Sequence, residues 1–506
     1  MAEASKPDPS TKSAAMQAMS AEIARVDAIL GGQDAIKRGA EAFLPKLTNE
    51  TQVDYADRLQ IAKFTNIFRD IVEGLASRPF QKDVTLDDAA PQSIKDFVEN
   101  VDGRGNNLSV FAAARFFAGI AYGFDWILVD FPPAPSALTR ADERALSLRP
   151  YWVPVSATAV ISVRSARYGG EEFLTEFRFW EGRTEEHGFT EKNIDRIRVL
   201  KREKLETGQY GPATYEVWEK TALATNVAAE WLKVEEGPIL IGGKPADRIP
   251  AVPFIPSRDR DAKFGVHPPM RDAATLQITH YQQESDLEYS RKMTCFPVLA
   301  GNGVTPPKDA AGNALPIQYG PKAVLFAPPD PMGKSQPSWE MIEPGAQSLT
   351  FCASRVDATE RQLRDLGRQP LTAQSANMTT VAAAKSAEKG NTAIQAWAVM
   401  LEDALENALA FTAKYLGEPV EPEVEVYKDF TIDPSETVQT DALLSMRKNG
   451  DISQRTLWDE MRRRKVLSDR FDPDDEEEAI LNEIPGDTPP DETTAALPPP
   501  GDQQAA

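Results

Sequence analysis

The chain has 506 residues, of which 41% are hydrophobic and 26% are charged, and its formal net charge is −21 at neutral pH. These values are typical of a folded globular protein with room for about two to four domains. The acidic balance disfavours a protein that binds nucleic acid by neutralising phosphates, but it is compatible with one that lets DNA slide past an acidic wall. The apolar runs are shorter than the ~20 residues of a membrane span, and the N-terminus lacks a signal-peptide pattern. We therefore expect a cytosolic product without a membrane segment.

The N-terminal part of the chain alternates helical patterns with turn residues. Residues 1–13 are polar, and we expect them to be disordered. Glycines end two of the helical patterns, at Gly31 with Gly32 and at Gly123. The predicted elements are, in chain order, helices over 14–30, 51–76 and 108–122 and a strand over 125–130.

Between about residues 149 and 256 the pattern changes to short strands. Phe173, Thr175, Phe177 and Phe179 alternate with Leu174, Glu176 and Arg178, and Glu181-Gly182 could form a turn after them. Short strands separated by turn residues indicate an antiparallel β region. The predicted strands include 173–179, 194–200 and 214–218.

Two long helices of similar length follow, with an insertion between them. The first is predicted over 270–293, and its 24 residues would span about 36 Å. The second is predicted over 346–366. Residues 295–345 are rich in Pro and Gly and contain short strand patterns, which indicates an antiparallel helix pair with a small β module at its tip. The apolar stripes are thin, which suits helices packed among like helices in a ring. The residues predicted to pack in this way are Ile278, Tyr281, Tyr289, Val356 and Leu363.

The C-terminal part is predicted to be mainly helical. A long helical stretch reaches Leu416 and is expected to be interrupted at Gly390. Ser453 is a plausible N-cap for the last helix, and the acidic and Pro-rich residues after it are expected to end in a disordered tail. The predicted elements are a strand over 424–432 and helices over 441–448 and 453–467, followed by a disordered segment over 486–506.

Motifs for catalysis are weak or absent. The three histidines are His187, His267 and His280; none has a second histidine or a cysteine at metal-ligand spacing, so no metal site is predicted. Cys295 and Cys352 are expected to be reduced, partly buried thiols. Two stretches approximate a phosphate-binding loop, but neither has the Gly-rich turn leading into a helix that this loop requires. These stretches are 237–244, whose lysine is followed by proline, and 333–335, which has Pro328 in place of the first glycine.

A set of short stretches, in this order, resembles the portal proteins of tailed bacteriophages, a family long catalogued as a domain of unknown function. The resemblance covers roughly residues 28–303, and its most specific part begins at Pro268-Pro269. The stretches are Ala28–Gly32, Phe43–Pro45, Asp54-Tyr55, Arg58, Phe64–Asn66, Gly74–Pro79, Asp125–Pro132, Arg149–Tyr151, Ile249–Phe254, Pro268-Pro269, Asp272–Ala274, His280-Tyr281, Ser285-Asp286 and Phe296–Gly303.

The resemblance implies an α+β portal fold, with an α/β wing, a two-helix stem, a small β-containing clip and a helical crown. Such chains form a ring of about twelve subunits at one capsid vertex. They are structural proteins without cofactor or catalytic activity. The implied segments are a disordered N-terminus (1–13), wing (14–265 and 393–440), stem helices (266–294 and 346–367), clip (295–345), tunnel loop (368–392), crown (441–485) and disordered tail (486–506).

The resemblance also implies partners and contact residues. Genomic DNA would pass through the ring during packaging and ejection without sequence specificity, and the ring would bind the major capsid protein, the terminase and then the head–tail adaptor. The protein would lie at the capsid vertex of the virion, and in the host cytoplasm during assembly. The residues expected to line the DNA channel are Arg368, Gln369, Lys385 and Lys389, and those expected to bind partners at the clip are Lys308, Lys322 and Lys334.

Two other classes of protein remain open from the sequence. Another head–tail structural protein, such as an adaptor or a scaffold, would lack the order of helix, inserted module and helix. A soluble enzyme with an unrecognised site would usually elute as a monomer or dimer, whereas a portal would elute as a large ring.

Overall fold

The structure is a computed structural model, and it divides the chain into two compact units, Met1–Thr431 and Ile432–Ala506. Both helices and strands occur, so the predicted α+β class is confirmed. For residues 293–294, 298, 380–392 and 462–463 and for His187 only the backbone is described. The described residues are 8–48, 50–132, 148–221, 229–257, 266, 268–294, 298–305, 307–308, 312, 324–329, 337–342, 347–366, 380–428, 430, 443–463, 467, 471, 473 and 476.

The N-terminal helices of the first unit follow the sequence pattern with one exception. The helix predicted over 14–30 is confirmed as α1, and the Ser13 side chain caps it by accepting the N–H of Met16. The single helix predicted over 51–76 is wrong, because the backbone turns to an extended conformation at Ala62 and Asn66 caps a new helix. The helices are α1 Ala14–Leu30, α2 Gly32–Arg38, α3 Gln52–Ile61, α4 Ile67–Ala76, α5 Gln92–Val98 and α6 Leu108–Tyr122.

Trp152 lies at the centre of the larger hydrophobic core. Its ring is fully buried and meets Phe97 and Phe111 edge-on, with centroids 5.5 and 5.4 Å away. Its indole N–H donates to the Thr412 hydroxyl at 2.9 Å. Thr412 belongs to α10 (Thr380–Leu416), so this contact joins the N-terminal helices to a helix more than 200 residues later in the chain.

A three-stranded antiparallel sheet, with strand order β13-β2-β3, supports that core. The strand predicted over 125–130 is confirmed as its central strand, β2, which follows directly after α6 and the left-handed Gly123. The strands are β2 Asp125–Asp130, β3 Tyr151–Val155 and β13 Ala251–Phe254.

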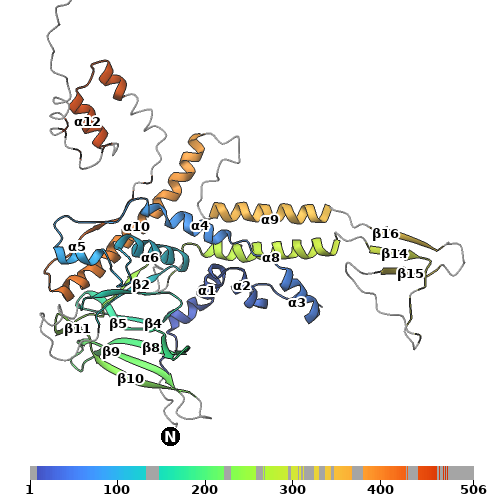
Figure 1. Cartoon of the computed structure of the whole chain (residues 1–506), viewed down its shortest axis with the longest axis horizontal. Helices are drawn as coiled ribbons and strands as arrows, with labels where there is room; N and C mark the ends of the chain where they lie inside the picture. Colours follow the sequence, from blue (N-terminus) through green and yellow to red (C-terminus); the bar gives the residue numbers. More distant parts are fainter. Residues whose placement is uncertain are drawn as a thin grey trace, which may run out of the picture. The chain divides into compact units, whose positions relative to one another are not determined.

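The predicted antiparallel β region is confirmed as a five-stranded sheet with strand order β10-β9-β8-β5-β4 (Figure 1). Phe177 and Phe179 of its inner face are buried in a second core together with Met16 and Met19 of α1. A separate hairpin, β6–β7, lies between β5 and β8 in the chain. The strands are β4 Val160–Tyr168, β5 Glu171–Trp180, β6 Arg183–His187, β7 Thr190–Ile194, β8 Arg196–Lys204, β9 Tyr210–Thr221 and β10 Glu230–Pro238.

Three further expectations are corrected by the fold. Residues 8–13 are ordered, because Arg178 donates to the carbonyls of Pro9 and Thr11, while residues 1–7 lie outside the described residues. The predicted interruption at Gly390 is wrong, since α10 continues through it; one glycine costs a helix only about 1 kcal/mol. Of the strand predicted over 424–432, the described residues (424–428 and 430) form only β17 (Val424–Glu425), which pairs with β1 (Thr85–Leu86).

The second unit contains two short helical segments in its described part. One covers residues 443–448 and the other is α12, Gln454–Arg463. The predicted N-cap is confirmed, because the hydroxyl of Ser453 accepts the N–H of Thr456 at 3.1 Å. The tail expected to be disordered, 486–506, lies outside the described residues.

Candidate functional site

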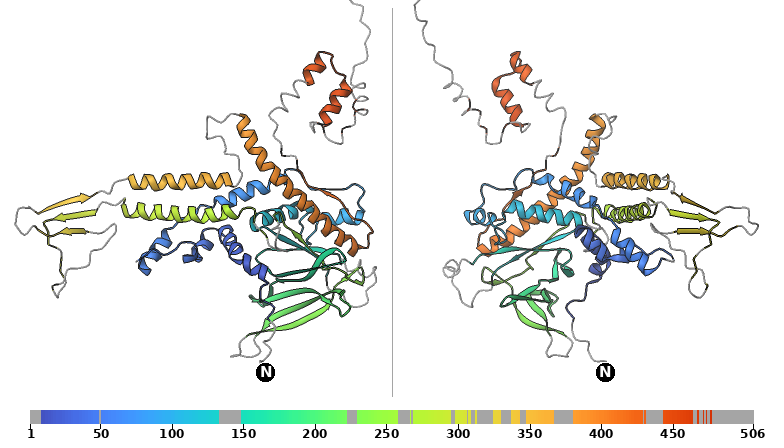
Figure 2. Two further views of the ribbon diagram at one scale, coloured as in Figure 1. Left: turned by 180° about the vertical axis from the view of Figure 1, so that it is seen from behind. Right: turned by 45° about the vertical axis from the view of Figure 1, so that its right-hand side comes forward.

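The predicted order of helix, inserted β module and helix is confirmed. Helices α8 (Arg271–Thr294) and α9 (Gln347–Leu366) run side by side in opposite directions (Figures 1 and 2), and Thr359 donates to the Gln283 side chain at 2.7 Å between them. The chain between the helices contains a three-stranded sheet with order β15-β14-β16. Its strands are β14 Val298–Asn302, β15 Val324–Ala327 and β16 Ser338–Ile342.

A buried glutamine fixes α8 to the N-terminal helices. The Gln277 side chain accepts the N–H of Phe68 and donates to the carbonyl of Thr65, both at 2.9 Å. Phe68 lies in the first turn of α4, where backbone N–H groups have no partner within the helix. Gln277 therefore satisfies an end of α4 and sets the position of α8 against it.

A cluster of three charged side chains lies where the middle of α8 meets α3 and the segment before it; Arg58 and Glu50 are buried and Asp286 is exposed. The Arg58 guanidinium donates to both carboxylate oxygens of Glu50, at 2.8 and 3.0 Å, and to the carbonyl of Pro45. Asp286 of α8 lies 3.7 Å from the same guanidinium. The hydrogen bonds from Arg58 hold the pKa of the Glu50 carboxyl below its ordinary value.

His280 of α8 is buried, one helical turn before Glu284, which accepts a hydrogen bond from Thr65 between α3 and α4. Its two ring nitrogens have no hydrogen-bond partner among the described residues, and the nearest carboxylate oxygen, of Glu284, is 3.8 Å away. Burial lowers the pKa of His280, which favours the neutral imidazole. No group of His, Cys, Asp and Glu that could hold a metal occurs in the part of the chain that the structure describes.

The five residues predicted to pack between ring subunits lie in different surroundings. Tyr281 and Leu363 are fully buried inside the chain, so neither can contact a neighbouring copy, and these two assignments are wrong. The cause is the contact of α8 and α9 with the N-terminal helices, which the helical period could not distinguish from a contact between subunits. Ile278 is half-buried against the same core, and Tyr289 and Val356 are half-buried on the helix pair.

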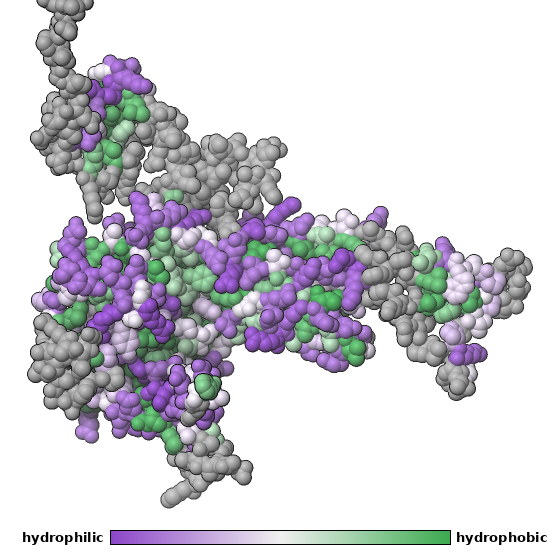
Figure 3. Space-filling model, viewed as in Figure 1, coloured by the Kyte–Doolittle hydropathy of each residue, from purple (hydrophilic) through white to green (hydrophobic). Residues whose placement is uncertain are grey.

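One face of the inserted sheet presents large apolar side chains to solvent. The strand register places Trp339, Met341 and Phe326 on the same face as Gly301. The Trp339 and Phe326 rings meet edge-to-face with centroids 5.9 Å apart, and a Cβ on Gly301 would lie 2.8 Å from the Trp339 ring. Trp339 and Met341 are 52% and 60% exposed, and Figure 3 shows hydrophobic residues on the visible side of this sheet.

These exposed side chains were not among the predicted site residues, although their strand carries a recognisable pattern. Residues 338–342 alternate Trp339 and Met341 with Ser338 and Glu340, which is the pattern of a strand with one apolar face. A third exposed apolar residue, Phe351 in the first turns of α9, is 67% exposed.

The residues predicted to contact DNA or partners are only partly described. Lys308 is exposed, whereas Lys322, Lys334, Arg368 and Gln369 lie outside the described residues. Lys385 and Lys389 lie on α10, and their side chains are outside the described part. Because α10 begins at Thr380, the second half of the predicted tunnel loop, 380–392, is helical.

The structure describes one of the two stretches that approximate a phosphate-binding loop and one of the two cysteines. The stretch 237–244 forms the end of β10 and the hairpin β11–β12 (Leu240–Ile241 and Lys244–Pro245), and no helix follows Lys244 directly, so a phosphate loop is excluded there. Cys352 is a half-buried free thiol, and Cys295 lies outside the described residues, as does the stretch 333–335.

Among the described helices, none is long and apolar enough to cross a membrane.

One protein-family model matches the part of the chain that contains the helix pair α8–α9 and helix α10. A family model described as a domain of unknown function (DUF4055) matches residues 269–416, from the start of α8 to the last residue of α10. The matched residues overlap the portal resemblance at 269–303, and residues 28–268 of that resemblance lie outside them. No curated protein matches the sequence.

Solved structures with similarity to the chain come from gene transfer agent particles. They include a chain of the virion of the native particle (TM-score 0.38, 11% identity, 83% of this chain and 96% of that one). Two others are from the neck of the empty particle with C6 symmetry (0.38, 12%, 83% and 90%) and the neck of the native particle with C12 symmetry (0.37, 12%, 89% and 98%). TM-scores this low do not establish a shared fold.

Proposed function

We propose that the chain is the portal subunit of a tailed bacteriophage, which forms a ring at one capsid vertex through which DNA is packaged and ejected. The observation that carries this proposal is the helix pair α8–α9 with its inserted sheet, whose Trp339, Met341 and Phe351 side chains are exposed. Large exposed apolar patches mark interaction sites. A ring of identical copies would cover these side chains on every subunit at once.

The attachment of the helix pair to the body supports the same proposal. Gln277 fixes α8 with two hydrogen bonds, and Asp286 of α8 lies 3.7 Å from the Arg58 guanidinium. Arg364 of α9 donates to Asp70 of α4 at 3.0 Å. A helix pair held in this way has a defined angle to the body, as a closed ring requires of each of its subunits. In this proposal residues 14–265 and 393–440 are the wing, 266–294 and 346–367 the stem, and 441–485 the crown.

The charge of the chain suits a channel through which DNA slides. A net charge of −21 per copy makes a ring repel phosphates overall and leaves few strong contacts. We propose that residues 368–392 line the constriction. Arg368, Gln369, Lys385 and Lys389 would there make weak, salt-sensitive contacts with the phosphate backbone that carry no sequence information.

Imaging of the purified full-length chain tests the proposed function. We expect rings of about twelve copies with a central channel, because exposed apolar surface on each copy is covered only by its neighbours. Negative-stain electron microscopy and mass photometry measure the shape and the mass. A monodisperse monomer at high protein concentration, over several salt concentrations, would refute the proposal.

A change in the inserted segment tests the proposed partners. We propose that 295–345, with Lys308, Lys322 and Lys334, binds the terminase during packaging and the head–tail adaptor afterwards, while the wing contacts the major capsid protein. Replacing 303–320 with a short Gly-Ser linker removes no residue of β14 or β15, so rings should form while binding to the terminase and the adaptor is lost. Pull-down from a packaging extract measures the binding, and rings of the unsubstituted chain are the control. Normal packaging by such rings would contradict the assignment.

A further inference from the structure

Residues 8–13, here called the strap, cross the outer face of the five-stranded sheet, opposite to the face that forms the second core. The N–H of Ser13 donates to the carbonyl of Ile161 on β4 at 3.1 Å. Arg178 of β5 lies between two buried phenylalanines and therefore points outward. Its guanidinium donates to the carbonyl of Pro9 at 2.9 Å. The strap is thus fixed to the first two strands that it crosses.

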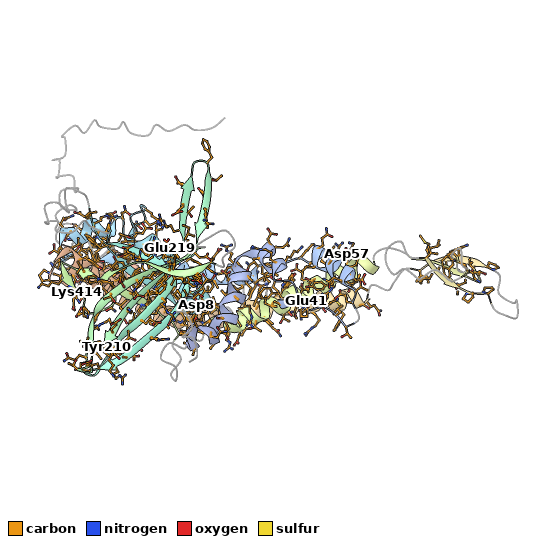
Figure 4. All side chains as sticks on the ribbon, turned by 90° about the horizontal axis from the view of Figure 1, so that it is seen from below. Asp8, Glu41, Asp57, Tyr210, Glu219 and Lys414 are labelled. Atoms are coloured by element: carbon orange, nitrogen blue, oxygen red, sulfur yellow. The ribbon has the colours of Figure 1, made fainter. Side chains whose placement is uncertain are left out.

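The N-terminal end of the strap reaches strand β9. Hydrogen bonds from Ser10, and with them the nearby charges of Lys220 and Arg178, hold the pKa of the Asp8 carboxyl below its ordinary value. Lys220 lies near the end of β9, next to Glu219. Figure 4 shows Asp8 over this sheet on the side of Glu219 rather than of Tyr210, at the other end of the strand. In the strand order of the sheet, only β10 lies beyond β9.

Three tryptophans lie on the same face, where the strap ends. Ile197 of β8 pairs with Trp180 on one side and with Trp218 on the other, so their side chains share the outer face. The ring centroids of Trp180 and Trp231 are 5.7 Å apart, and the Lys220 ammonium is 5.9 Å from the Trp231 ring. Ile197 is fully buried, whereas Trp180 is 37% exposed. An aromatic surface therefore continues the apolar face beyond the strap.

The chain before the strap has the length and the residues to cover this surface. Residues 1–7, MAEASKP, precede Asp8 and lie outside the described residues. Neighbouring strands are about 4.8 Å apart, so roughly two residues suffice to pass from β9 over β10. Proline favours an extended conformation of the residue before it, so Pro7 and Pro9 direct Lys6 and Asp8 onward across the sheet. Pro9 is already buried, and the apolar ring of Pro7 suits an indole surface in the same way.

We propose that residues 1–7 continue the strap over β10 and cover Trp180 and Trp231, with the ring of Pro7 packed on the indole groups. The N-terminus of the same chain is the occupant, because the strap already ends beside this surface. Tryptophan is enriched at protein interfaces, and a strap in this place keeps these rings from other proteins. The inference is independent of the proposed ring, since every residue in it belongs to one copy.

Deletion of residues 1–7 tests the cover through the access of acrylamide to tryptophan. A chain that begins at Asp8 should show a higher Stern–Volmer quenching constant than the full chain, because two indole groups become more exposed. The same deletion in a chain with Trp180→Phe and Trp231→Phe should leave the constant of the remaining tryptophans unchanged. Both rings are partly exposed, so phenylalanine should preserve the fold. No rise after the deletion, or an equal rise in both backgrounds, would overturn the inference.

Cross-linking tests the path of the N-terminus without altering a tryptophan. In a chain whose native cysteines are serine, Ala4→Cys should form a disulfide with Lys233→Cys, because Lys233 pairs with Trp218 on the outer face. Leu232→Cys is the matched control, since Leu232 is 36% exposed but points to the opposite face. Peptide mapping by mass spectrometry measures the yields. Equal yields at 232 and 233 would contradict the path over β10.

A mixture of isotope-labelled and unlabelled protein identifies the chain that supplies the N-terminus. We expect the disulfide between positions 4 and 233 to join peptides of the same label at every protein concentration. A disulfide that joins labelled to unlabelled peptides would show that a neighbouring copy covers the tryptophans, and it would overturn the inference. The proposed function does not depend on either result, because ring formation is measured separately.

Discussion

Replacing Trp152 with alanine should lower the free energy of unfolding of the first unit by about 3–5 kcal/mol, the usual cost of deleting a buried tryptophan. The substitution leaves a cavity between Phe97 and Phe111 and removes the hydrogen bond to Thr412. Urea denaturation followed by far-ultraviolet circular dichroism measures the change. Because Trp152 joins the N-terminal helices to α10, the transition should stay cooperative while its midpoint falls.

Trp339→Ala is the matched control for this prediction. Trp339 is half exposed on the inserted sheet of a single copy, so below the protein concentration at which rings assemble the same change of residue type should alter the unfolding free energy by less than about 1 kcal/mol. Equal destabilisation by the two substitutions would show that the core around Trp152 is assigned wrongly.

Arg58→Ala should also destabilise the chain by about 3–5 kcal/mol at neutral pH, because it leaves the buried Glu50 carboxylate without its counter-charge. The effect should depend on pH. Glu50 has a lowered pKa in the folded chain, so its contribution is present above the ordinary value of 4.5 and is lost as the pH falls through the lowered value. The difference between wild type and variant should therefore shrink in acid.

Unfolding curves at pH 7 and in the acid range below pH 4.5 test this pH dependence. Arg69→Ala is the matched control, since Arg69 pairs with Glu73 on the exposed face of α4 and such pairs contribute about 0.5 kcal/mol or less. A loss for Arg58→Ala as small as that for Arg69→Ala, or one that is the same at both pH values, would contradict the assigned role of the cluster.

Part of the candidate site could be predicted from residue order alone. The spacing of apolar residues and the Pro- and Gly-rich insertion between 295 and 345 predicted α8, the inserted strands and α9 to within a few residues. Trp339 and Met341 were missed because alternation shows that a strand has an apolar face, but not whether another part of the chain covers that face. Tyr281 and Leu363 were misassigned for the same reason.

The sequence by itself determined the local elements of this protein: the caps at Ser13 and Ser453, the helix end at Gly123 and the alternation along β5. These depend on contacts within a few residues, so the local pattern contains the needed information. Only the tertiary structure decided that α10 continues through Gly390, where packing and length outweigh the cost of one glycine. It alone also brought Trp152 to Thr412, because burial depends on long-range contacts that no local pattern specifies.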